Sequence, residues 1–161
     1  MNIRKLEERD IARCLEIYNY YIENTTYSFE EEPLTYERFA ERVNLIRSSY
    51  PFIVCEDGEA VVGYAYLDRF HERSAYRYTA DLSIYLDKNE LARGTGGKLL
   101  REIEKLGREQ GITNIISLVT GENDRSCAFH EKHGFERVGR LKNVGVKFAR
   151  ILDVFYYQKS I

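Results

Sequence analysis

The segment Asp81-Leu82-Ser83-Ile84-Tyr85-Leu86, followed by Leu91-Ala92-Arg93-Gly94-Thr95-Gly96-Gly97-Lys98, decides the fold. Its first part predicts the end of a strand over 79–86, and its second part is a glycine-rich turn that opens a helix over 98–110. Glycines let main-chain N–H groups converge on an anion, and the helix dipole adds positive potential at the same place. This pattern predicts a phosphate site, although a helix start without a ligand fits the same residues.

Two familiar nucleotide motifs do not fit this turn. The dinucleotide pattern Gly-x-Gly-x-x-Gly, started at Gly94, ends on Leu99. The P-loop requires Ser or Thr after its lysine, whereas Lys98 is followed by Leu99, and position 92 is Ala. The turn is therefore neither of these motifs.

Working outward from the turn, hydrophobic spacing predicts one mixed α/β chain. Asp10 is expected to cap the first helix and Thr35 to precede the second. A tight turn at 56–59 predicts an antiparallel hairpin. The expected strands are 3–6, 52–55, 60–67, 79–86, 115–119, 136–141 and 151–158, and the helices begin near 11, 36, 98 and 125.

Composition narrows the class of protein. A length of 161 residues fits one domain, and a net charge of -2 gives no electrostatic reason to expect nucleic acid. No apolar run reaches the roughly 18 residues of a membrane span, and the charged N-terminus is unlike a signal peptide, so a cytoplasmic location is expected. Cys14, Cys55 and Cys127 form no Cys-x-x-Cys pair and are expected to be inert thiols. His130 and His133 lack zinc-site spacing, so no metal is expected.

The arrangement of strand, turn and helix resembles the GNAT (Gcn5-related) N-acetyltransferase superfamily. In that superfamily a strand splays from its neighbour, and a Gln/Arg-x-x-Gly-x-Gly/Ala turn binds the coenzyme pyrophosphate. The pattern falls on Leu91 to Gly96, where both glycines match and Leu91 replaces the usual Gln or Arg. The resemblance implies a mostly antiparallel sheet with a splayed central strand pair flanked by helices, and acetyl-CoA as cosubstrate with rearranged pyrophosphate contacts.

Nearly the whole chain resembles the phosphinothricin and methionine-sulfoximine acetyltransferase group within that superfamily. The matching segments include Tyr27-Ser28-Phe29-Glu30, Ala75 to Tyr85, Glu122 to Ser126, His130 to Phe135 and Val144 to Phe148. This resemblance implies transfer of acetyl to the amino group of a small amino-acid-like molecule, and a homodimer.

The resemblance also implies two catalytic residues. Asp81 occupies the position of the group's glutamate base, and because Asp is one methylene shorter, a bridging water is expected. His130 occupies the position where many members have a tyrosine that protonates the coenzyme thiolate. A solvated carboxylate at a strand start and a locally packed helix histidine are the alternatives for these two residues.

The remaining site residues divide between coenzyme and amine. The main chain of the strand, the turn and the start of the helix before His130 are expected to contact the coenzyme, although Asn and Ser are also ordinary helix caps. Arg73 is a candidate clamp for a substrate carboxylate. The expected coenzyme residues are Ile84, Tyr85, Leu86, Leu91, Ala92, Arg93, Gly94, Thr95, Gly96, Asn123, Ser126 and Lys132, and the expected substrate residues are Tyr27, Phe29, His71, Glu72, Arg73 and Tyr76.

Three functions fit the sequence. The first is acetylation of a free amino acid or analogue such as phosphinothricin, methionine sulfone or methionine sulfoximine. The second keeps acetyl-CoA but acts on a polyamine, an aminoglycoside or a protein N-terminus, for which Glu30, Glu31 and Glu32 leave room for an acidic cleft. The third is a non-catalytic acyl-CoA binding module, which the departures at Asp81 and Leu91 would fit.

Overall fold

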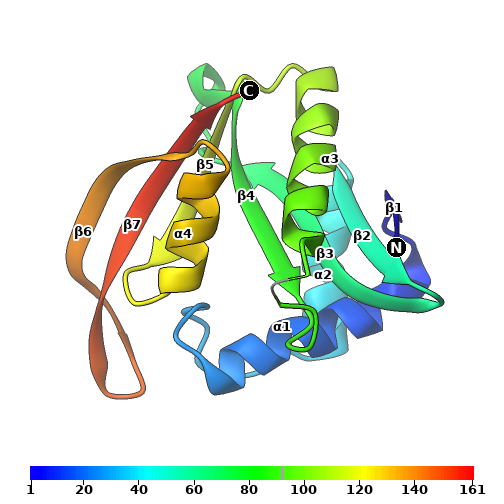
Figure 1. Cartoon of the computed structure of the whole chain (residues 1–161), viewed down its shortest axis with the longest axis horizontal. Coiled ribbons are helices and arrows are strands. Elements are labelled where there is room, and N and C mark those ends of the chain that lie inside the picture. The colour runs from blue at the N-terminus through cyan, green and yellow to red at the C-terminus, as the bar shows by residue number, and fades with distance from the viewer. Residues whose placement is uncertain (92) are drawn as a thin grey trace.

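The computed structural model describes residues 1–91 and 93–161. Within these residues, seven strands form one sheet in the order β1-β2-β3-β4-β5-β7-β6 (Figure 1). The strands are β1 (Asn2–Lys5), β2 (Phe52–Asp57), β3 (Ala60–Arg69), β4 (Thr79–Leu86), β5 (Asn114–Thr120), β6 (Glu136–Lys147) and β7 (Arg150–Ser160). The helices are α1 (Ile11–Asn24), α2 (Tyr36–Arg47), α3 (Thr95–Glu109) and α4 (Asp124–Lys132), with short 3-10 turns at Glu8–Asp10 and Ser74–Tyr76.

The two central strands, β4 and β5, run parallel, whereas the other neighbours in the described sheet are antiparallel. A parallel pair needs a crossover, and α3 supplies it. The pairing covers only Thr79–Asp81 of β4 against Asn114–Ile116 of β5, after which the strands diverge (Figure 1). The predicted mixed sheet with a splayed central pair is confirmed.

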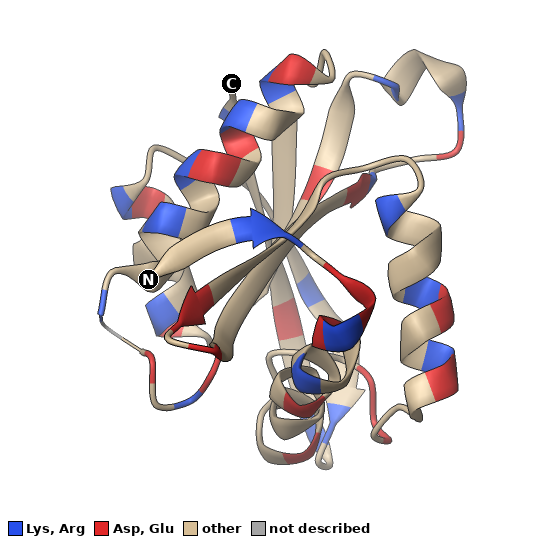
Figure 2. Cartoon of the chain, turned by 90° about the vertical axis from the view of Figure 1, so that its right-hand side faces the viewer, with Lys and Arg blue, Asp and Glu red and all other residues tan. Residues whose placement is uncertain are grey.

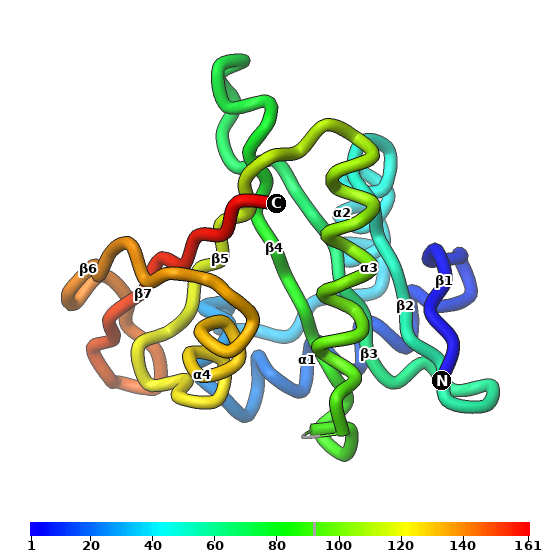
Figure 3. Tube along the Cα trace, turned by 45° about the horizontal axis from the view of Figure 1, so that its top comes forward, coloured from blue at the N-terminus to red at the C-terminus, as the bar shows by residue number. Residues whose placement is uncertain are grey.

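Helices cover both faces of the sheet. Helices α1 and α2 lie on one face and α3 and α4 on the other (Figures 1 and 3). Each face buries its own apolar cluster, which includes Ile17 and Val43 on the first face and Leu67, Leu99 and Ile103 on the second. Burying a side chain of this size contributes about 1.5–3 kcal/mol, so the two clusters hold the sheet between the helix layers.

The predicted start of α3 lies too far along the sequence. The helix begins at Thr95 instead of Lys98, and Gly94 precedes it with φ +83°. A left-handed residue of this kind is tolerated best by glycine. The glycine-rich turn therefore ends inside the first turn of the helix, which brings Gly96 and Gly97 into the helix itself.

Asp10 stands at the N-cap position of α1, as predicted, but its side chain makes no capping hydrogen bond to that helix. Thr35 does cap α2, because its side chain accepts a hydrogen bond from Arg38 N at 3.3 Å. Asp10 instead ends a 3-10 turn, where its carboxylate accepts from Glu7 N at 2.7 Å and binds the Arg4 guanidinium at 2.7 and 2.8 Å. The competing arginine turns the carboxylate away from the helix that follows.

The last two strands are longer than predicted. The strands expected over 136–141 and 151–158 are parts of one long hairpin, β6 and β7. The pairing register shifts between Leu141 and Gly145, which is a bulge that absorbs the residues the sequence pattern placed in a loop. Phe148 and Ala149, both with positive φ, form the tight turn at the tip.

No helix among the described residues is long and apolar enough to cross a membrane. Acidic and basic residues are mixed along the surface helices (Figure 2). Cys14 and Cys55 are buried free thiols, as expected, and burial raises the pKa of Cys14 to about 12. Cys127 is only partly buried. In the described part of the chain, no group of three or more His, Cys, Asp or Glu side chains is placed to hold a metal ion.

Candidate active site

The site is built on the point where β4 and β5 separate. Asp81, paired with Ile116, is the last β4 residue in the parallel ladder. Along the rest of β4, the edge toward β5 has no ladder partner in the described residues. Exposed main-chain donors and acceptors must find another partner, which makes this edge suitable for an extended ligand that pairs like a strand. The predicted residues Ile84, Tyr85 and Leu86 lie along it.

Asp81 points to the face covered by α1 and α2. Its neighbours Ala80 and Leu82 belong to the cluster on the α3 face, and strand side chains alternate. Its Oδ1 is inaccessible and has no hydrogen-bond partner in the described residues. Burial, and to a lesser extent the carboxylate of Asp68 directly opposite on β3, together raise the pKa of Asp81 to about 7. A carboxylate with this pKa can accept a proton near neutral pH.

The start of α3 combines a fixed turn with close packing. A Cβ on Gly96 would lie 3.2 Å from the Phe129 ring, and one on Gly97 would lie 3.0 Å from the His133 ring. These two glycines therefore let α3 approach α4. A Cβ on Gly94 would meet nothing within 4 Å, so Gly94 is required by its φ instead. The result is a 15-residue helix with an open N-terminus beside the divergent strands, as an anion site requires.

An internal ion pair braces the same turn. Arg93 Nη1 binds Glu90 Oε1 at 2.6 Å, and Thr95 Oγ1 donates to Glu90 Oε2 at 3.3 Å. The Glu90 side chain is buried, which favours keeping its charge paired. Arg93 is therefore already paired with Glu90, while its side chain is 57% exposed at the surface. Of the other predicted residues, Leu91 is half-buried and Ala92 lies outside the described residues.

Three of the predicted residues at α4, Asn123, Ser126 and His130, make hydrogen bonds within this helix or at its start. Asn123 caps it by accepting a hydrogen bond from Ser126 N at 3.1 Å. His130 is buried, its Nδ1 lies 2.7 Å from Ser126 O, and its ring stacks on Tyr157. A carbonyl oxygen can only accept a hydrogen bond. Nδ1 therefore carries the hydrogen of the neutral ring, and Nε2 is left as an acceptor. Burial lowers the pKa of His130 and favours this neutral ring. Lys132 is exposed.

The structure does not bring Asp81 and His130 together. Asp81 faces α1 and α2, whereas His130 packs against Tyr157 and Phe135, which belong to the cluster on the opposite face. Each can reach a reacting group only from its own side of the divergent strands. The two roles predicted from the sequence therefore remain separate in space.

The predicted substrate residues form two groups. His71, Glu72, Arg73 and Tyr76 are exposed in the loop before β4, where the His71 and Tyr76 rings lie 4.8 Å apart. Tyr27 and Phe29 lie between α1 and α2. In Figures 1 and 3 the loop lies at the start of β4, and the segment that holds the two aromatic residues lies at the opposite end. The chain does not gather all six residues into one pocket.

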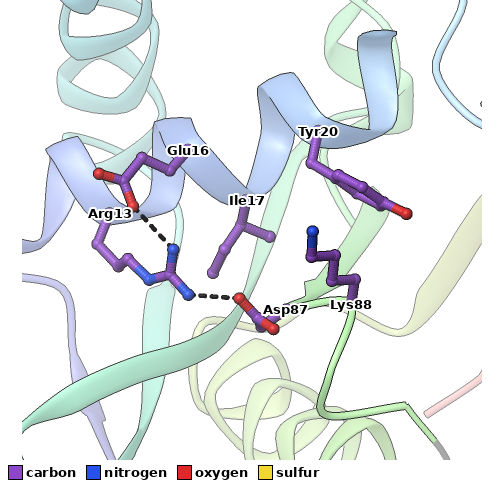
Figure 4. A pocket seen from close by; sticks show the side chains of 6 residues that line it. All are labelled: Arg13, Glu16, Ile17, Tyr20, Asp87 and Lys88. Atoms are coloured by element: carbon purple, nitrogen blue, oxygen red, sulfur yellow. Dashed lines mark hydrogen bonds and ion pairs between the residues drawn. The ribbon is translucent and has the colours of Figure 1, made fainter. Parts of the chain in front are cut away.

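A shallow hollow of about 220 Å³ lies beside the end of β4 (Figure 4). Arg13 from α1 binds both Glu16 and Asp87 there, and the Lys88 ammonium lies 5.0 Å from the centre of the Tyr20 ring. The charges of Arg13, Glu16 and Asp87 in this hollow are thus already paired with one another. The ion pair to Asp87 fixes the end of β4 to α1, which steadies the strand edge described above.

Comparison with known proteins identifies the fold and its chemistry. Residues 3–155 match the family model described as an acetyltransferase (GNAT) domain. The chain belongs to the GNAT acetyltransferase family. The family predicted from the sequence is confirmed.

Relatives of this GNAT acetyltransferase match it over nearly the whole chain. The L-methionine sulfoximine/L-methionine sulfone acetyltransferase of Pseudomonas aeruginosa is 30% identical over 162 residues, covering 99% of this chain and 94% of that protein. A phosphinothricin acetyltransferase from Sinorhizobium meliloti in complex with acetyl-CoA is 33% identical, with a TM-score of 0.96 and 99% and 88% coverage. A ribosomal-protein-alanine N-acetyltransferase from Brucella melitensis is 34% identical, with a TM-score of 0.95 and 100% coverage of both chains.

Two residues of this GNAT acetyltransferase site were missed by the sequence analysis. Asp68 pairs with Asp81 in the register of β3 and β4, which only an exact alignment of the two strands would have indicated. Tyr21 of α1 donates its hydroxyl hydrogen to Leu86 O at 2.8 Å. That bond occupies one acceptor at the end of the open β4 edge.

Proposed function

We propose that this chain is an acetyl-CoA-dependent N-acetyltransferase that acts by direct transfer on a small amino-acid-like amine of the phosphinothricin, methionine sulfone or methionine sulfoximine type. The observation that carries the proposal is Asp81, a carboxylate with a pKa of about 7 and an unpartnered Oδ1, at the point where β4 leaves β5. The names of the relatives support the substrate class.

Asp81 is the proposed general base. The acceptor arrives as an ammonium ion, and the Asp81 carboxylate takes one proton from it, directly or through a water. The neutral amine then attacks the thioester carbonyl carbon, the C–N bond forms, and the C–S bond breaks. The thiolate that leaves takes up one proton. The attacking nitrogen loses its second proton as the amide forms, and this proton balances the one that the thiolate takes up. His130 is the proposed shuttle: Nε2, which is free as an acceptor, takes the proton and passes it to the thiolate, while the Nδ1 hydrogen stays on Ser126 O.

The residues around β4 fit acetyl-CoA, which supplies the activated acetyl group. The open edge at Ile84, Tyr85 and Leu86 offers main-chain groups to the pantetheine arm. The N-terminal N–H groups of α3, at Thr95 and Gly96, suit the pyrophosphate, with Gly94 fixing the approach of the chain. We assign lesser roles to the other predicted contacts, Leu91, Arg93, Asn123, Ser126 and Lys132, because a helix cap or an ion pair already engages three of them.

The amine is proposed to bind on the α1 and α2 side of β4, where Asp81 points. Arg73 is the proposed partner of an acceptor carboxylate, since a guanidinium binds it bidentately. Tyr27 and Phe29, about 40% exposed, are the proposed apolar wall. Their segment lies at the opposite end of β4 from the Arg73 loop, so the two groups are proposed to contact opposite ends of the acceptor (Figures 1 and 3). An N-terminal peptide is the second candidate acceptor, and the ribosomal-protein-alanine relative supports it.

A homodimer and a cytoplasmic location complete the proposal. Apolar side chains are exposed along the β6–β7 hairpin, and an exposed apolar strand edge favours association. The exposed residues are Val138, Leu141, Val144, Val146, Phe148 and Ile151. Acetyl-CoA is highly charged and crosses membranes poorly, which supports a location where the cell makes it. Light scattering coupled to gel filtration tests the dimer, and a monomeric mass at working concentration would exclude it.

The proposed function is tested by acetyl-CoA turnover, followed through the released thiol. The acceptor panel contains phosphinothricin, methionine sulfone, methionine sulfoximine, spermidine, an aminoglycoside and an N-terminal peptide. Asp81→Asn is expected to lose at least about a hundredfold in kcat, whereas Asp57→Asn, an exposed carboxylate at the end of β2, is the matched control. Turnover of only the peptide or polyamine would overturn the substrate class.

The acid role of His130 needs its own measurement. His130→Asn is expected to lower kcat for acetyl transfer with little change in KM for either substrate. A fall in thermal stability with kcat unchanged would assign His130 to packing against Tyr157 alone.

A further inference from the structure

The segment between α1 and α2 alternates between anchored and exposed residues. Thr26 and Ser28 are 3% and 6% exposed, whereas Tyr27 and Phe29 are 41% and 40% exposed. An unsupported loop of this length would leave its side chains free to move. Here the two small polar residues are held inside, and the two aromatic rings project outward, so the backbone presents the rings in a fixed direction.

The first anchor comes from the end of β5. Thr120 Oγ1 donates to Thr26 O at 2.8 Å, and both residues are buried. The Thr26 hydroxyl donates to Glu122, whose other carboxylate oxygen binds Arg150 at the tip of the hairpin. The segment that follows α1 is thus fastened to the end of β5 and, through Glu122, to the start of β7.

The second anchor is a buried lysine of β6. Lys147 is 1% exposed, and its Nζ donates to Ser28 O at 2.7 Å. Burial lowers the pKa of Lys147, while the Glu30 and Glu31 carboxylates oppose that change. Lysine is almost never fully buried without a partner, because removing an ammonium from water is costly. At this position a carbonyl of the aromatic segment is that partner.

The third contact is steric and comes from the same strand. Gly145 faces the Phe29 ring, and a Cβ built on Gly145 would lie 2.7 Å from Phe29 Cζ. Contacts below 3.0 Å are not tolerated, so any other residue at 145 must displace the ring. The absence of a side chain at Gly145 therefore determines where Phe29 lies.

We infer that Lys147 of β6 is a positioning residue for the Tyr27–Phe29 segment and that Gly145 is the position that seats the Phe29 ring, so that these two residues affect which amine the enzyme accepts. This inference rests on the proposed function, in which that segment forms the apolar wall for the acceptor. Lys147 acts through the Ser28 carbonyl and does not touch the substrate. Because Lys147 and Gly145 both contact this segment, replacing either residue is expected to affect the amine and not acetyl-CoA.

The test of Lys147 separates the two substrates. In Lys147→Met, the KM for the amine is expected to rise about tenfold, the size of one lost buried hydrogen bond. The dissociation constant for acetyl-CoA stays within about twofold of wild type. Lys142→Met, an exposed lysine on the same strand, is the control and leaves both unchanged. An unchanged amine KM, or an equal loss for both ligands, overturns the inference.

A second readout does not depend on turnover. Hydrogen exchange at the amides of residues 26–29 is expected to be about tenfold faster in Lys147→Met, with β4 amides unchanged. If wild type acetylates no amine in the panel, the proposed function fails, and faster exchange still supports the positioning role. Exchange equal to wild type at residues 26–29 overturns that role even if turnover is normal.

A double-mutant cycle tests Gly145. Gly145→Ala and Phe29→Ala are each expected to lower kcat/KM for the amine, and the double variant is no worse than Phe29→Ala alone, because the clash disappears with the ring. Gly139→Ala on the same strand is the control, since its Cβ would lie at an ordinary 3.8 Å from Tyr156. Additive losses in the double variant would show that Gly145 acts on something other than Phe29 and would overturn its assigned role.

Discussion

Replacing Asp68 by Asn removes the charge that faces Asp81 while leaving β3 intact. Asp68 and Asp81 are directly opposite in the antiparallel register, and the Asp68 carboxylate already accepts a hydrogen bond from Arg69 N at 2.7 Å, which an amide oxygen can retain. With the neighbouring charge gone, ionised Asp81 is less disfavoured, and its pKa falls. Burial, the larger cause of the raised pKa, remains.

The size of the effect follows from the spacing of the two strands. Opposite Cβ atoms lie about 5 Å apart, which puts the two charges roughly 6 Å apart. At an effective dielectric constant of about 40, suited to half-exposed groups, their repulsion is about 1.4 kcal/mol, or about one pH unit. That is a minor share of the rise from 3.8 to about 7, as expected if burial is the larger cause. The midpoint of the acid limb in the pH profile of kcat/KM should therefore move from about pH 7 to about pH 6.

The assay is the pH profile of kcat/KM for the best amine, normalised to its alkaline plateau. Ionised Asp81 at pH 6 rises from about a tenth to about a half of the enzyme, so the normalised value at pH 6 should rise about fivefold in Asp68→Asn. At pH 8 it should change little. Asp57→Asn should leave the limb in place. A limb that stays near 7, or moves to higher pH, would refute the role of Asp68.

Three further predictions concern stability and the coenzyme. The native pKa of Asp81 lies above its unfolded value of 3.8, so its ionisation costs stability as pH rises from about 4 to about 7. Asp81→Asn should thus raise Tm by about 5 °C at pH 8, equivalent to about 2 kcal/mol after allowing for solvent access, and leave it unchanged at pH 3. Gly94→Ala, at φ +83°, should cost about 1–2 kcal/mol and raise the KM for acetyl-CoA about tenfold, whereas Gly58→Ala, at φ +64° in the β2–β3 turn, should cost the same stability without changing that KM. Thr35→Ala should lower the free energy of unfolding by about 1 kcal/mol in urea titrations and leave kcat/KM unchanged, because Thr35 only caps α2.

Local patterns predicted much of the fold. The range of β4 was predicted as observed, and the apolar spacing of α1 and α2 selected the faces that are buried. One side-chain cap failed because the side chain had a competing partner, and the boundaries of the last two strands failed because the chain bulged. Arg4 draws Asp10 away from its cap, and the bulge before Gly145 lets β6 continue through residues that read as a loop. Neither the arginine contact nor the bulge is encoded in local spacing.

The candidate site was predictable only as separate pieces. Asp81, the glycine-rich turn and His130 were found from sequence, but their relation in space was not. The register that places Asp68 against Asp81 and the strand alternation that separates Asp81 from His130 are properties of the sheet. Lys147 gave no signal, because a lysine in a strand pattern normally lies on the solvent face, and its burial depends on a segment 119 residues away.

Aspartate, which is one methylene shorter than glutamate, suits position 81 because of where this residue lies on β4. At Asp81 the strand is still paired with β5, so the carboxylate begins close to the point of divergence, and its unpartnered Oδ1 is already removed from solvent. The raised pKa follows from that enclosure, which a longer side chain reaching into open space would partly lose. In Asp81→Glu the carboxyl should therefore have a lower pKa than in wild type, and the acid limb of the pH profile of kcat/KM should lie at lower pH. The same divergence that frees the β4 edge for the coenzyme thus gives the base its pKa, which explains why the two features occur on one strand.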